Sequence, residues 1–286
     1  MKIITFNDYI SRLKDRKTFT VRRLSSEVYH KGRAVSSSMM KAFADNASPQ
    51  EIYHRFVKID APSRDTPAFI FGRAFHKICL ERPRFFDDFA IYEGKTRRGK
   101  NFDEFAAKNI GKDIITNEIY DDCRRLRDVL YKVPEVRSLL TGGIAESSTI
   151  WIDEETGVKC KARADYIKGD VVIDLKTCAN ASRHAFNKDM IKYYYYIQAG
   201  HYMEGFDKDY FAFIVIDKGI YPRVHVIDLS DQYYEMADAA RRTQMQRVAY
   251  FEAHYTKNKE WPAANDTHLV LDPPSYIYNQ VMENAL

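Results

Sequence analysis

Several features that mark secreted, membrane and metal-cluster proteins are missing from this sequence of 286 residues. Four cysteines are present, but they form no C-x-x-C pair, which argues against a zinc ribbon or an iron–sulfur site: Cys79, Cys123, Cys160 and Cys178. The sequence contains no run of about 18 apolar residues, the length that is needed to cross a bilayer. The opening MKIITFNDYISRLKDRK lacks an apolar region followed by a small-residue cleavage site. We therefore expect a cytoplasmic protein with reduced, structural thiols and no membrane partner.

An excess of charge of one sign is also missing. The chain has 44 Lys and Arg against 40 Asp and Glu, so its formal net charge is only +4. This total does not by itself indicate a nucleic-acid binder, because phosphate contacts depend on local clusters of cations. A content of 45% hydrophobic and 29% charged residues is typical of a globular protein. We expect one core domain over residues 36–286, preceded by a polar, basic arm in residues 1–35.

The apolar patterning predicts a mixture of helices and strands. Helical periodicity is found over 36–58, with an interruption near Ser48-Pro49, and over 68–81, 116–140, 184–204 and 231–256. Alternating or continuous apolar residues predict strands over 145–153, 158–169, 171–177, 210–217 and 221–228. The order is helices, three strands, helix, two strands, helix. It indicates an α/β protein (mixed α+β) with a central mixed β-sheet flanked by helices.

The stretch VVIDLKT places an acid and a lysine together at the end of an apolar strand. Residues two apart in a strand share a face, so Asp174 and Lys176 point together while Leu175 points into the opposite layer. A carboxylate that holds Mg²⁺ beside a lysine that activates water is the arrangement of a metal-dependent nuclease. The pattern D/E-x-K occurs three times in the chain, and only this one ends an apolar strand.

The neighbouring segments contain further polar candidates. Asp165 precedes Asp174 by one hairpin turn, so both acids could converge on one ion, or Asp165 could be a surface acid beside a turn. Gln198 and Tyr202 share a helix face that could hold water or phosphate beside the metal. For the tyrosines 193–196 we favour packing of the helix on the sheet.

Other candidates stay open when judged from the residues alone. His76, beside the apolar stripe of 68–81, is either a packed histidine or a ligand. Glu146 begins a strand and is equally ambiguous. The cluster KTRRGK at 95–100 is either a solvated turn or a mobile clamp for phosphates.

Several of these motifs together resemble the PD-(D/E)xK nuclease superfamily. They are FGRAFHK, AESSTIW, the turn DEETG, KARADYI, the IDLKT strand and QAGHY, in this order along the chain. Within the superfamily the sequence is similar to the catalytic domain of RecE, or exonuclease VIII, and its phage-encoded relatives. The similarity runs from VSSSMMKAF to the WPAANDTH and LDPP region and so covers most of the chain. It implies a core like that of restriction endonucleases.

The resemblance implies a role for each matching residue. His76, Asp165, Asp174 and the Leu175 carbonyl would bind the metal, Mg²⁺ with Mn²⁺ as a substitute. Lys176 would activate the attacking water. Gln198 and Tyr202 would match the helix motif of the family, and Glu146 would be a supporting acid, so the predicted catalytic residues are Asp165, Asp174, Lys176, Glu146, Gln198 and Tyr202. The acid of the x-K motif is aspartate here, whereas glutamate is commoner in the superfamily. The RecE-like branch also uses aspartate.

The resemblance also implies an activity and partners. Its members are 5′-to-3′ exonucleases on linear double-stranded DNA that release 5′-mononucleotides and leave a 3′ single strand for an annealing protein during recombination. Such enzymes form homo-oligomeric rings around DNA. Contacts to DNA are expected from five cations: Lys95, Arg97, Arg98, Lys100 and Arg163.

Three other functions remain open. An endonuclease of restriction or repair type would use the same chemistry without requiring free DNA ends. A domain that binds DNA or a protein without cutting would be free to lose Asp174 or Lys176, and both are present. An α/β protein with purely structural acids would leave the combination of motifs as coincidence. A related branch with an iron–sulfur clasp is disfavoured, because no cysteine follows Cys178.

Overall fold

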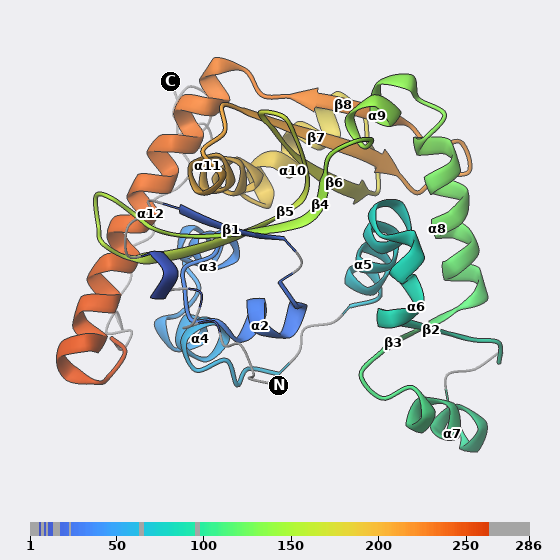
Figure 1. The fold of residues 1–286 in the computed structure, drawn as a ribbon, viewed down its shortest axis with the longest axis horizontal. Helices are drawn as coiled ribbons and strands as arrows, with labels where there is room; N and C mark the ends of the chain where they lie inside the picture. The colour runs from blue at the N-terminus through green and yellow to red at the C-terminus, as the bar shows by residue number, and fades with distance from the viewer. Residues whose placement is uncertain are drawn as a thin grey trace, which may run out of the picture.

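The computed structural model describes residues 6, 9, 11–13, 18–22, 24–62, 66–94 and 98–262. Its main element is a six-stranded sheet (Figure 1) of order β1-β4-β5-β6-β7-β8. The strands β6 and β7 are parallel, and the other neighbours are antiparallel. The predicted α/β class with a mixed sheet is confirmed. The six strands are β1 (Thr18–Arg22), β4 (Ile144–Ile152), β5 (Lys159–Lys168), β6 (Val171–Cys178), β7 (Tyr210–Asp217) and β8 (Val224–Asp228).

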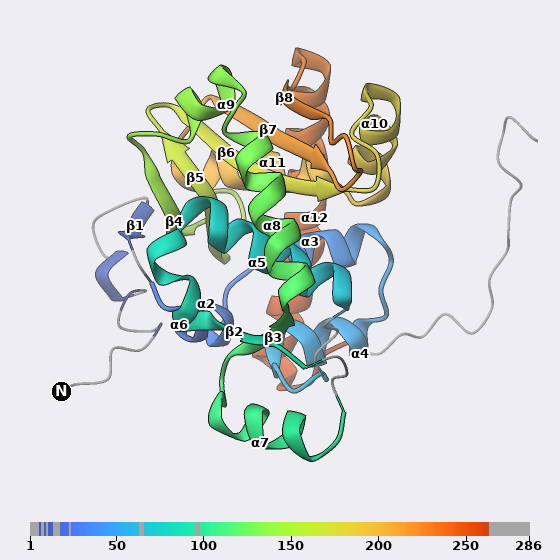
Figure 2. The same cartoon turned by 90° about the vertical axis from the view of Figure 1, so that its right-hand side faces the viewer.

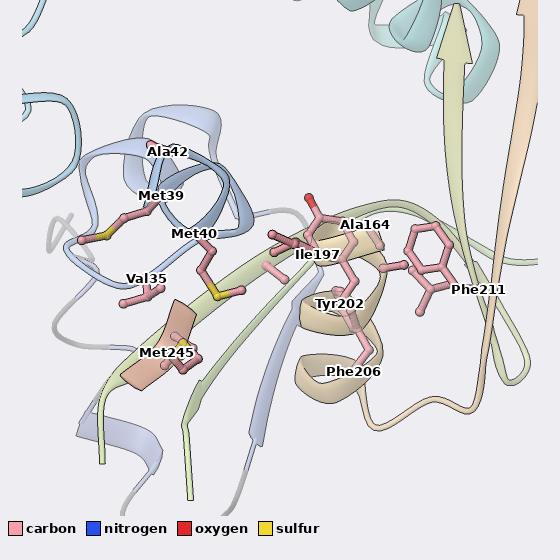
Figure 3. Close-up of a cluster of buried hydrophobic side chains, with 14 of the residues drawn as sticks. Val35, Met39, Met40, Ala42, Ala164, Ile197, Tyr202, Phe206, Phe211 and Met245 are labelled. Carbon is pink, nitrogen blue, oxygen red and sulfur yellow. The ribbon is translucent and has the colours of Figure 1, made fainter. Parts of the chain in front are cut away.

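Five helices pack on one face of the sheet, which we call the α11 face. They are α3 (Ser37–Ala44), α4 (Pro49–Ile52), α10 (Arg183–Lys192), α11 (Tyr195–Phe206) and α12 (Asp231–Asn258). The short π-helix η2 (Tyr53–Val57) continues α4. Figure 3 shows Met40 of α3, Tyr202 of α11 and Met245 of α12 among the buried side chains of this face. Burial of these side chains fixes α3 and α11 close to the ends of β5 and β6.

The opposite face is covered by a second group of helices, which we call the α5 face. It consists of α5 (Pro67–Leu80), α6 (Phe85–Asp88), α8 (Asn117–Leu130) and α9 (Pro134–Leu139), with the 3₁₀ turn η3 (Arg82–Arg84). Figure 1 shows α5 and α8 on the right, away from α3, α11 and α12. Ile173 and Leu175 of β6 point into this face, whereas Val172 packs with the α11 face. The alternation therefore turns Asp174 and Lys176 toward α11.

Two of the predicted helices are broken in the structure, so their prediction as single helices was wrong. The segment 116–140 stops after Leu130 and resumes at Pro134, because proline lacks the backbone N–H of a helix interior and disfavours helical geometry in the residue before it. The segment 184–204 divides at Tyr194, whose φ of 52° is left-handed. The kink allows α11 to lie across the sheet at its own angle.

Several elements were not predicted. The strand β1 lies in the segment described above as an arm and pairs with β4 along its whole length, from Thr18 opposite Trp151 to Arg22 opposite Ser147. Short and partly charged, it carries little apolar signal. The strands β2 (Phe89–Tyr92) and β3 (Asp113–Thr116) form a small parallel sheet. The helix α7 (Lys100–Lys108) lies between them in the sequence and projects at the bottom of Figure 2. The remaining short elements are η1 (Ser11–Leu13) and α2 (Ser26–Lys31).

All four cysteines are free, and only Cys178 is more than slightly exposed. In the part of the chain that the structure describes, no helix is both long and apolar enough to cross a bilayer.

Candidate active site

Three acids lie in a row across three neighbouring strands. Ala145 and Ser147 of β4 pair with Tyr166 and Ala164 of β5, which places Glu146 opposite Asp165. On the other side, Tyr166 pairs with Ile173 of β6, so Asp165 and Asp174 are the next residues on the two strands, and the Asp165 side chain reaches the Leu175 amide. The prediction that the hairpin turn would bring Asp165 and Asp174 together is therefore confirmed by the register.

The sheet opens into a fork at this row. Regular pairing between β5 and β6 is limited to three residue pairs beside their turn, the last of them Tyr166 with Ile173. Beyond it the Leu175 amide donates to Oδ2 of Asp165 at 2.8 Å, so a side chain takes the place of a strand carbonyl. Because Leu175 uses its N–H in this way, Asp165 is held against β6 just where the two strands separate.

His76 reaches the fork from α5. Its Nδ1 lies 3.4 Å from Oδ2 of Asp165. Burial alone would lower the pKa of His76, but the Asp165 carboxylate outweighs burial and raises that pKa to about 9. Burial likewise works against the charge on Asp165, yet the facing imidazolium lowers the pKa of this carboxyl. The two side chains therefore form an ion pair, and the sequence alone had left His76 open between packing and ligation.

On the α11 face, Asp174 is almost completely buried and is held by two partners. Lys176 Nζ lies 2.7 Å from Oδ2, and the Gln198 amide donates to Oδ1. Burial raises the pKa of Asp174, and the nearby Asp165 adds to this effect. Burial opposes the charge on Lys176, but the Asp174 carboxylate together with Tyr195 and Asp165 outweighs burial and raises the pKa of this lysine. The predicted sharing of one face by Asp174 and Lys176 is confirmed, and Gln198 joins them.

A second lysine, not found from the sequence, completes this cluster. Lys41 of α3 donates from Nζ to Oε1 of Gln198 at 2.7 Å, and Lys176 Nζ lies 3.5 Å from the same oxygen. Burial and the adjacent Lys176 ammonium lower the pKa of Lys41. No spacing rule could connect Lys41 with Gln198, since 157 residues separate them. The only signal was its place in VSSSMMKAF, a stretch that carries part of the family resemblance.

Tyr195 lies beneath both lysines. The Nζ atoms of Lys41 and Lys176 are 5.0 and 4.7 Å from the centroid of its ring. A cation over the face of an aromatic ring is stabilised by the ring quadrupole, more strongly where water is excluded. Packing on the core is confirmed for tyrosines 194–196, but it was wrong for Tyr193, which is 45% exposed. That interpretation was incomplete for Tyr195, which also contacts the charged cluster.

The backbone at Glu146 departs from strand geometry. Its φ of 50° lies in the left-handed region, which is costly for a residue with a Cβ atom and is found most often at functional positions. Burial raises the pKa of Glu146, and the facing Asp165 raises it further. Glu146 therefore belongs to the same electrostatic group as Asp165 and His76, at the edge of the row.

Tyr202 lies one turn beyond Gln198 but has a different environment. It is buried on the α11 face, and its hydroxyl is hydrogen-bonded to Ser37 of α3. Burial raises the pKa of Tyr202 well above the usual value of a tyrosine. Its position supports the packing of α3 against α11, the two helices that carry Lys41 and Gln198.

Of the five predicted DNA-binding cations, the three that the structure describes are not gathered at one place. Arg163 lies on β5, but its guanidinium donates to Ser148 Oγ at 3.0 Å and to the Leu24 carbonyl at 2.9 Å, and it stacks on Tyr29. These contacts tie the segment before α2 to the sheet. Arg98 and Lys100 lie at the start of α7, where both are exposed. Lys95 and Arg97 fall outside the described residues.

A divalent metal would fit the donors at the fork, although they do not form a closed cage. Within the described parts of the chain, no three histidine, cysteine, aspartate or glutamate side chains form a ready-made metal site. The donors at hand are two carboxylates, the Leu175 carbonyl and, once it has lost its proton, the His76 imidazole, a largely oxygen set of the kind that Mg²⁺ and Mn²⁺ prefer. Oδ2 of Asp174 is buried and, among the described residues, has Lys176 as its one close polar partner, so it retains a lone pair for a ligand beside this lysine.

A family model, described as a PDDEXK-like domain of unknown function (DUF3799), matches residues 36–267. The chain belongs to this family. The predicted membership of the PD-(D/E)xK superfamily is thus confirmed, and nucleases of this superfamily generally use divalent metal ions. No curated protein matches the chain.

One of the similar solved structures shares the fold of this chain. A structure from Eubacterium rectale, named "Putative exonuclease", is 16% identical and has a TM-score of 0.60; the match covers 91% of this chain and 98% of that one. An alkaline exonuclease from Laribacter hongkongensis is 14% identical with a TM-score of 0.28, covering 67% of this chain and 96% of that one. The first similarity shows that this chain shares its fold with that structure over nearly its whole length.

Proposed function

We propose that this PDDEXK-like protein is a Mg²⁺-dependent exonuclease that degrades linear double-stranded DNA. The observation that carries the proposal is the row of Glu146, Asp165 and Asp174 with Lys176 beside its last member. An acid row, a lysine and an imidazole support direct hydrolysis of a phosphodiester. The name of the similar structure from Eubacterium rectale favours the exonuclease over other nucleases.

Each residue of the cluster has a proposed task. His76, Asp165, Asp174 and the Leu175 carbonyl would hold the cation, which supplies Lewis-acid polarisation of the phosphate and activation of the attacking water. Lys176 places its ammonium beside Asp174, where it orients the water and stabilises the negative charge that develops on the phosphate.

Gln198 and Glu146 support these groups. Gln198 holds Asp174 by donating to Oδ1, which leaves Oδ2 turned toward Lys176. Glu146 faces Asp165, and burial raises its pKa. Protonation of Glu146 therefore determines whether the outer end of the row of acids is charged.

The finer features of the proposal come from the resemblance to RecE-like exonucleases. They are 5′-to-3′ polarity, release of 5′-mononucleotides, a 3′ single-stranded product, a homo-oligomeric ring and delivery of the product to a single-strand annealing protein in recombination. Mn²⁺ would replace Mg²⁺, and the protein would act in the cytoplasm. A labelled duplex end would determine polarity, because 5′-to-3′ digestion releases a 5′ label at once and a 3′ label last.

Digestion of a linear duplex and of the same DNA as a closed circle tests the activity. Each substrate is incubated with Mg²⁺ or with EDTA, using the wild type and the Asp174→Asn variant, which preserves shape. We expect loss of the linear form only, dependent on Mg²⁺ and absent in the variant. Cutting of the circle would favour an endonuclease, and the absence of cutting in either form would favour a binding module.

The Lys176→Ala variant separates chemistry from binding. We expect a fall in cleavage rate of at least about a hundredfold, since a buried charge at a transition state contributes roughly 3 kcal/mol or more. Affinity for DNA, measured in EDTA, should change little. The matched control is Lys31→Ala, which removes an exposed lysine that is paired with Glu27. Wild-type turnover in Lys176→Ala would remove this lysine from the mechanism.

A further inference from the structure

The turn between β7 and β8 exposes two large apolar side chains side by side. Tyr221 is 92% exposed and Ile220 is 84% exposed, and no large hydrophobic residue in the described part of the chain is more exposed than Tyr221. Two adjacent apolar side chains that contact almost nothing gain no burial energy from the fold. We call this pair the hairpin tip.

The backbone beneath the hairpin tip is firmly anchored. Asp217, at the end of β7, is only 4% exposed, and its Oδ1 accepts hydrogen bonds from the amides of Gly219 and Arg223 at 3.3 and 3.2 Å. Its Oδ2 accepts from the Ala181 amide at 3.4 Å and faces Arg223 Nε at 3.2 Å. A buried carboxylate with this many donors fixes the loop before any ligand arrives.

Two helices of the α5 face hold the same loop from outside. Arg125 of α8 donates to the Gly219 carbonyl at 3.2 Å. Lys218 Nζ lies 5.1 Å above the ring of Phe71 in α5, the helix that also carries His76. The tip is therefore exposed in one fixed position, which is the condition for a contact surface that binds without an ordering cost.

The hairpin tip lies at the active-site end of the sheet. Strands β6 and β7 run parallel, with Lys176 opposite Val215 and Cys178 opposite Asp217, so the tip follows directly beyond the site-bearing strand. Six residues separate Val215 from Tyr221, which limits their separation to about 20 Å. Figure 2 shows α10, which follows β6, on the side to which both strands point. At roughly 3.4 Å per base step, the tip is within about six steps of the site.

The charge around the tip favours a polyanion. In the region that the structure describes, Lys218 and Arg183 form no ion pair, and both are exposed. Arg223 is paired with the buried Asp217, and Arg125 with the exposed Asp122. An exposed phenol on a turn that also carries the exposed Lys218 combines the two features with which proteins bind single-stranded nucleic acid, base stacking and attraction of the backbone.

We propose that the Ile220–Tyr221 tip is a stacking site for an unpaired DNA base. The inference rests on the proposed exonuclease and deepens it. Digestion of one DNA strand at the active site leaves bases of the uncut DNA strand without partners, and the first of these bases presents an open face to Tyr221. Ile220 covers the edge of the same base. The tip thus holds the uncut strand away from the acids while the cut strand stays at Lys176.

The experiment uses DNA with 2-aminopurine in the uncut strand, at the first positions beyond the duplex end. Binding and fluorescence are measured in EDTA, so that no cleavage occurs. We expect the wild type to quench the fluorescence and Tyr221→Ala to lose both this quenching and about tenfold or more in affinity for the tailed DNA. Tyr221→Trp should restore both, because indole also stacks.

The matched control is Tyr210→Ala. Tyr210 is 60% exposed at the beginning of β7, at the opposite end of the same strand from the tip. An equal loss in Tyr210→Ala, or no loss in Tyr221→Ala, would overturn the stacking site. Light scattering in parallel would overturn it as well if Tyr221→Ala changed the oligomeric mass, because the tip would then be a contact between copies of the chain.

A small phosphodiester, thymidine 5′-p-nitrophenyl phosphate, separates failure of this inference from failure of the proposed function. Wild type and Tyr221→Ala should hydrolyse it at equal rates, because it does not reach the tip. A wild type that hydrolyses neither this compound nor DNA contradicts the exonuclease itself. Active enzymes with unchanged affinity for tailed DNA contradict only the stacking site.

Discussion

At the scale of single residues, Gln198 organises the charged cluster on the α11 face. A lysine can only donate, so the ammonium of Lys41 fixes Oε1 of Gln198 toward itself and toward Lys176. The amide nitrogen must then face Asp174, to which it donates. The orientation of one amide therefore determines which oxygen of Asp174 remains for Lys176 and for a cation. Lys41 acts on the reaction through Gln198, and we regard it as a positioning residue.

Replacing Lys41 tests this arrangement. In Lys41→Met we expect the maximal rate of DNA cleavage to fall about tenfold or more, as for loss of a hydrogen bond to a charged group. The concentration of Mg²⁺ that gives half-maximal rate should rise, because Asp174 loses its fixed orientation, while the Michaelis constant for DNA stays nearly the same. The temperature of thermal unfolding should not decrease, because the substitution removes a charge whose burial is unfavourable.

Two further variants define the outcome for Lys41. Lys41→Arg keeps a donor and should recover part of the rate, and Lys31→Met, at an exposed ion pair, should behave as the wild type. Unchanged Mg²⁺ dependence in Lys41→Met would show that Gln198 keeps its orientation without Lys41.

The left-handed backbone at Glu146 gives a prediction that separates stability from activity. Glu146→Ala and Glu146→Gly both remove the acid, but only glycine relieves the strained φ of 50°. We expect the glycine variant to unfold at higher denaturant concentration than the alanine variant, by about 1 kcal/mol. Both should lose at least about tenfold in cleavage rate. A glycine variant less stable than the alanine variant would mean that the left-handed geometry carries no strain.

At the scale of elements, α11 lies close to β4 because a glycine makes room for a tryptophan. A Cβ atom at Gly205 would lie 2.4 Å from the Trp151 ring, which is buried and cannot move aside. Thr149 of the same strand donates to the Gly205 carbonyl at 2.8 Å. The angle of α11, and with it the place of Gln198, depends on this contact.

Substitution of two helical glycines by alanine should have opposite effects. Gly205→Ala should lower the free energy of unfolding by about 1–3 kcal/mol through overpacking against Trp151. Gly72→Ala in α5, where a Cβ would meet nothing within 4 Å, should raise it by about 0.5–1 kcal/mol by reducing chain entropy in the unfolded state. Chemical denaturation measures both. Equal effects of the two substitutions would contradict the tight contact at Gly205.

The sequence predicted the elements whose signals are local. An apolar strand ending in Asp174 and Lys176, and a turn short enough to bring Asp165 opposite, follow from period and spacing alone. The break at Tyr194 did not, because a tyrosine in left-handed geometry carries no sequence signature. Lys41 was missed because its partner lies far along the chain, and β1 because five polar and apolar residues at an edge give too weak a pattern.

At the scale of the whole molecule, buried histidine links stability to pH. His201 is fully buried beside Trp151, and burial lowers its pKa to about 4 from an ordinary value of 6.5. Below pH 6.5 His201 is protonated in the unfolded chain but stays neutral in the folded protein. The free energy of unfolding therefore decreases as the pH is lowered from 6.5 to about 4. The loss from this residue amounts to about 3 kcal/mol.

The measurement is the free energy of unfolding between pH 7 and 4. In His201→Gln, which cannot titrate, the curve should fall less steeply than in the wild type over this range. His225, an exposed histidine on β8, supplies the control in His225→Gln, whose curve should follow that of the wild type. Parallel curves for wild type and His201→Gln would show that His201 is protonated in the folded protein.

The fork between β5 and β6 also connects the chemistry to the mechanics of the sheet. Between β5 and β6, the strands at the boundary of the two halves of the sheet, the described ladder consists of three residue pairs and the bond from Leu175 to Asp165. Hydrogen exchange at the Leu175 amide is therefore governed by a carboxylate, whereas its neighbours are governed by carbonyls. The exchange rate of this one backbone proton therefore depends on whether Asp165 is charged. Protonation of Asp165 or binding of a cation to it changes the strength of the contact between β5 and β6.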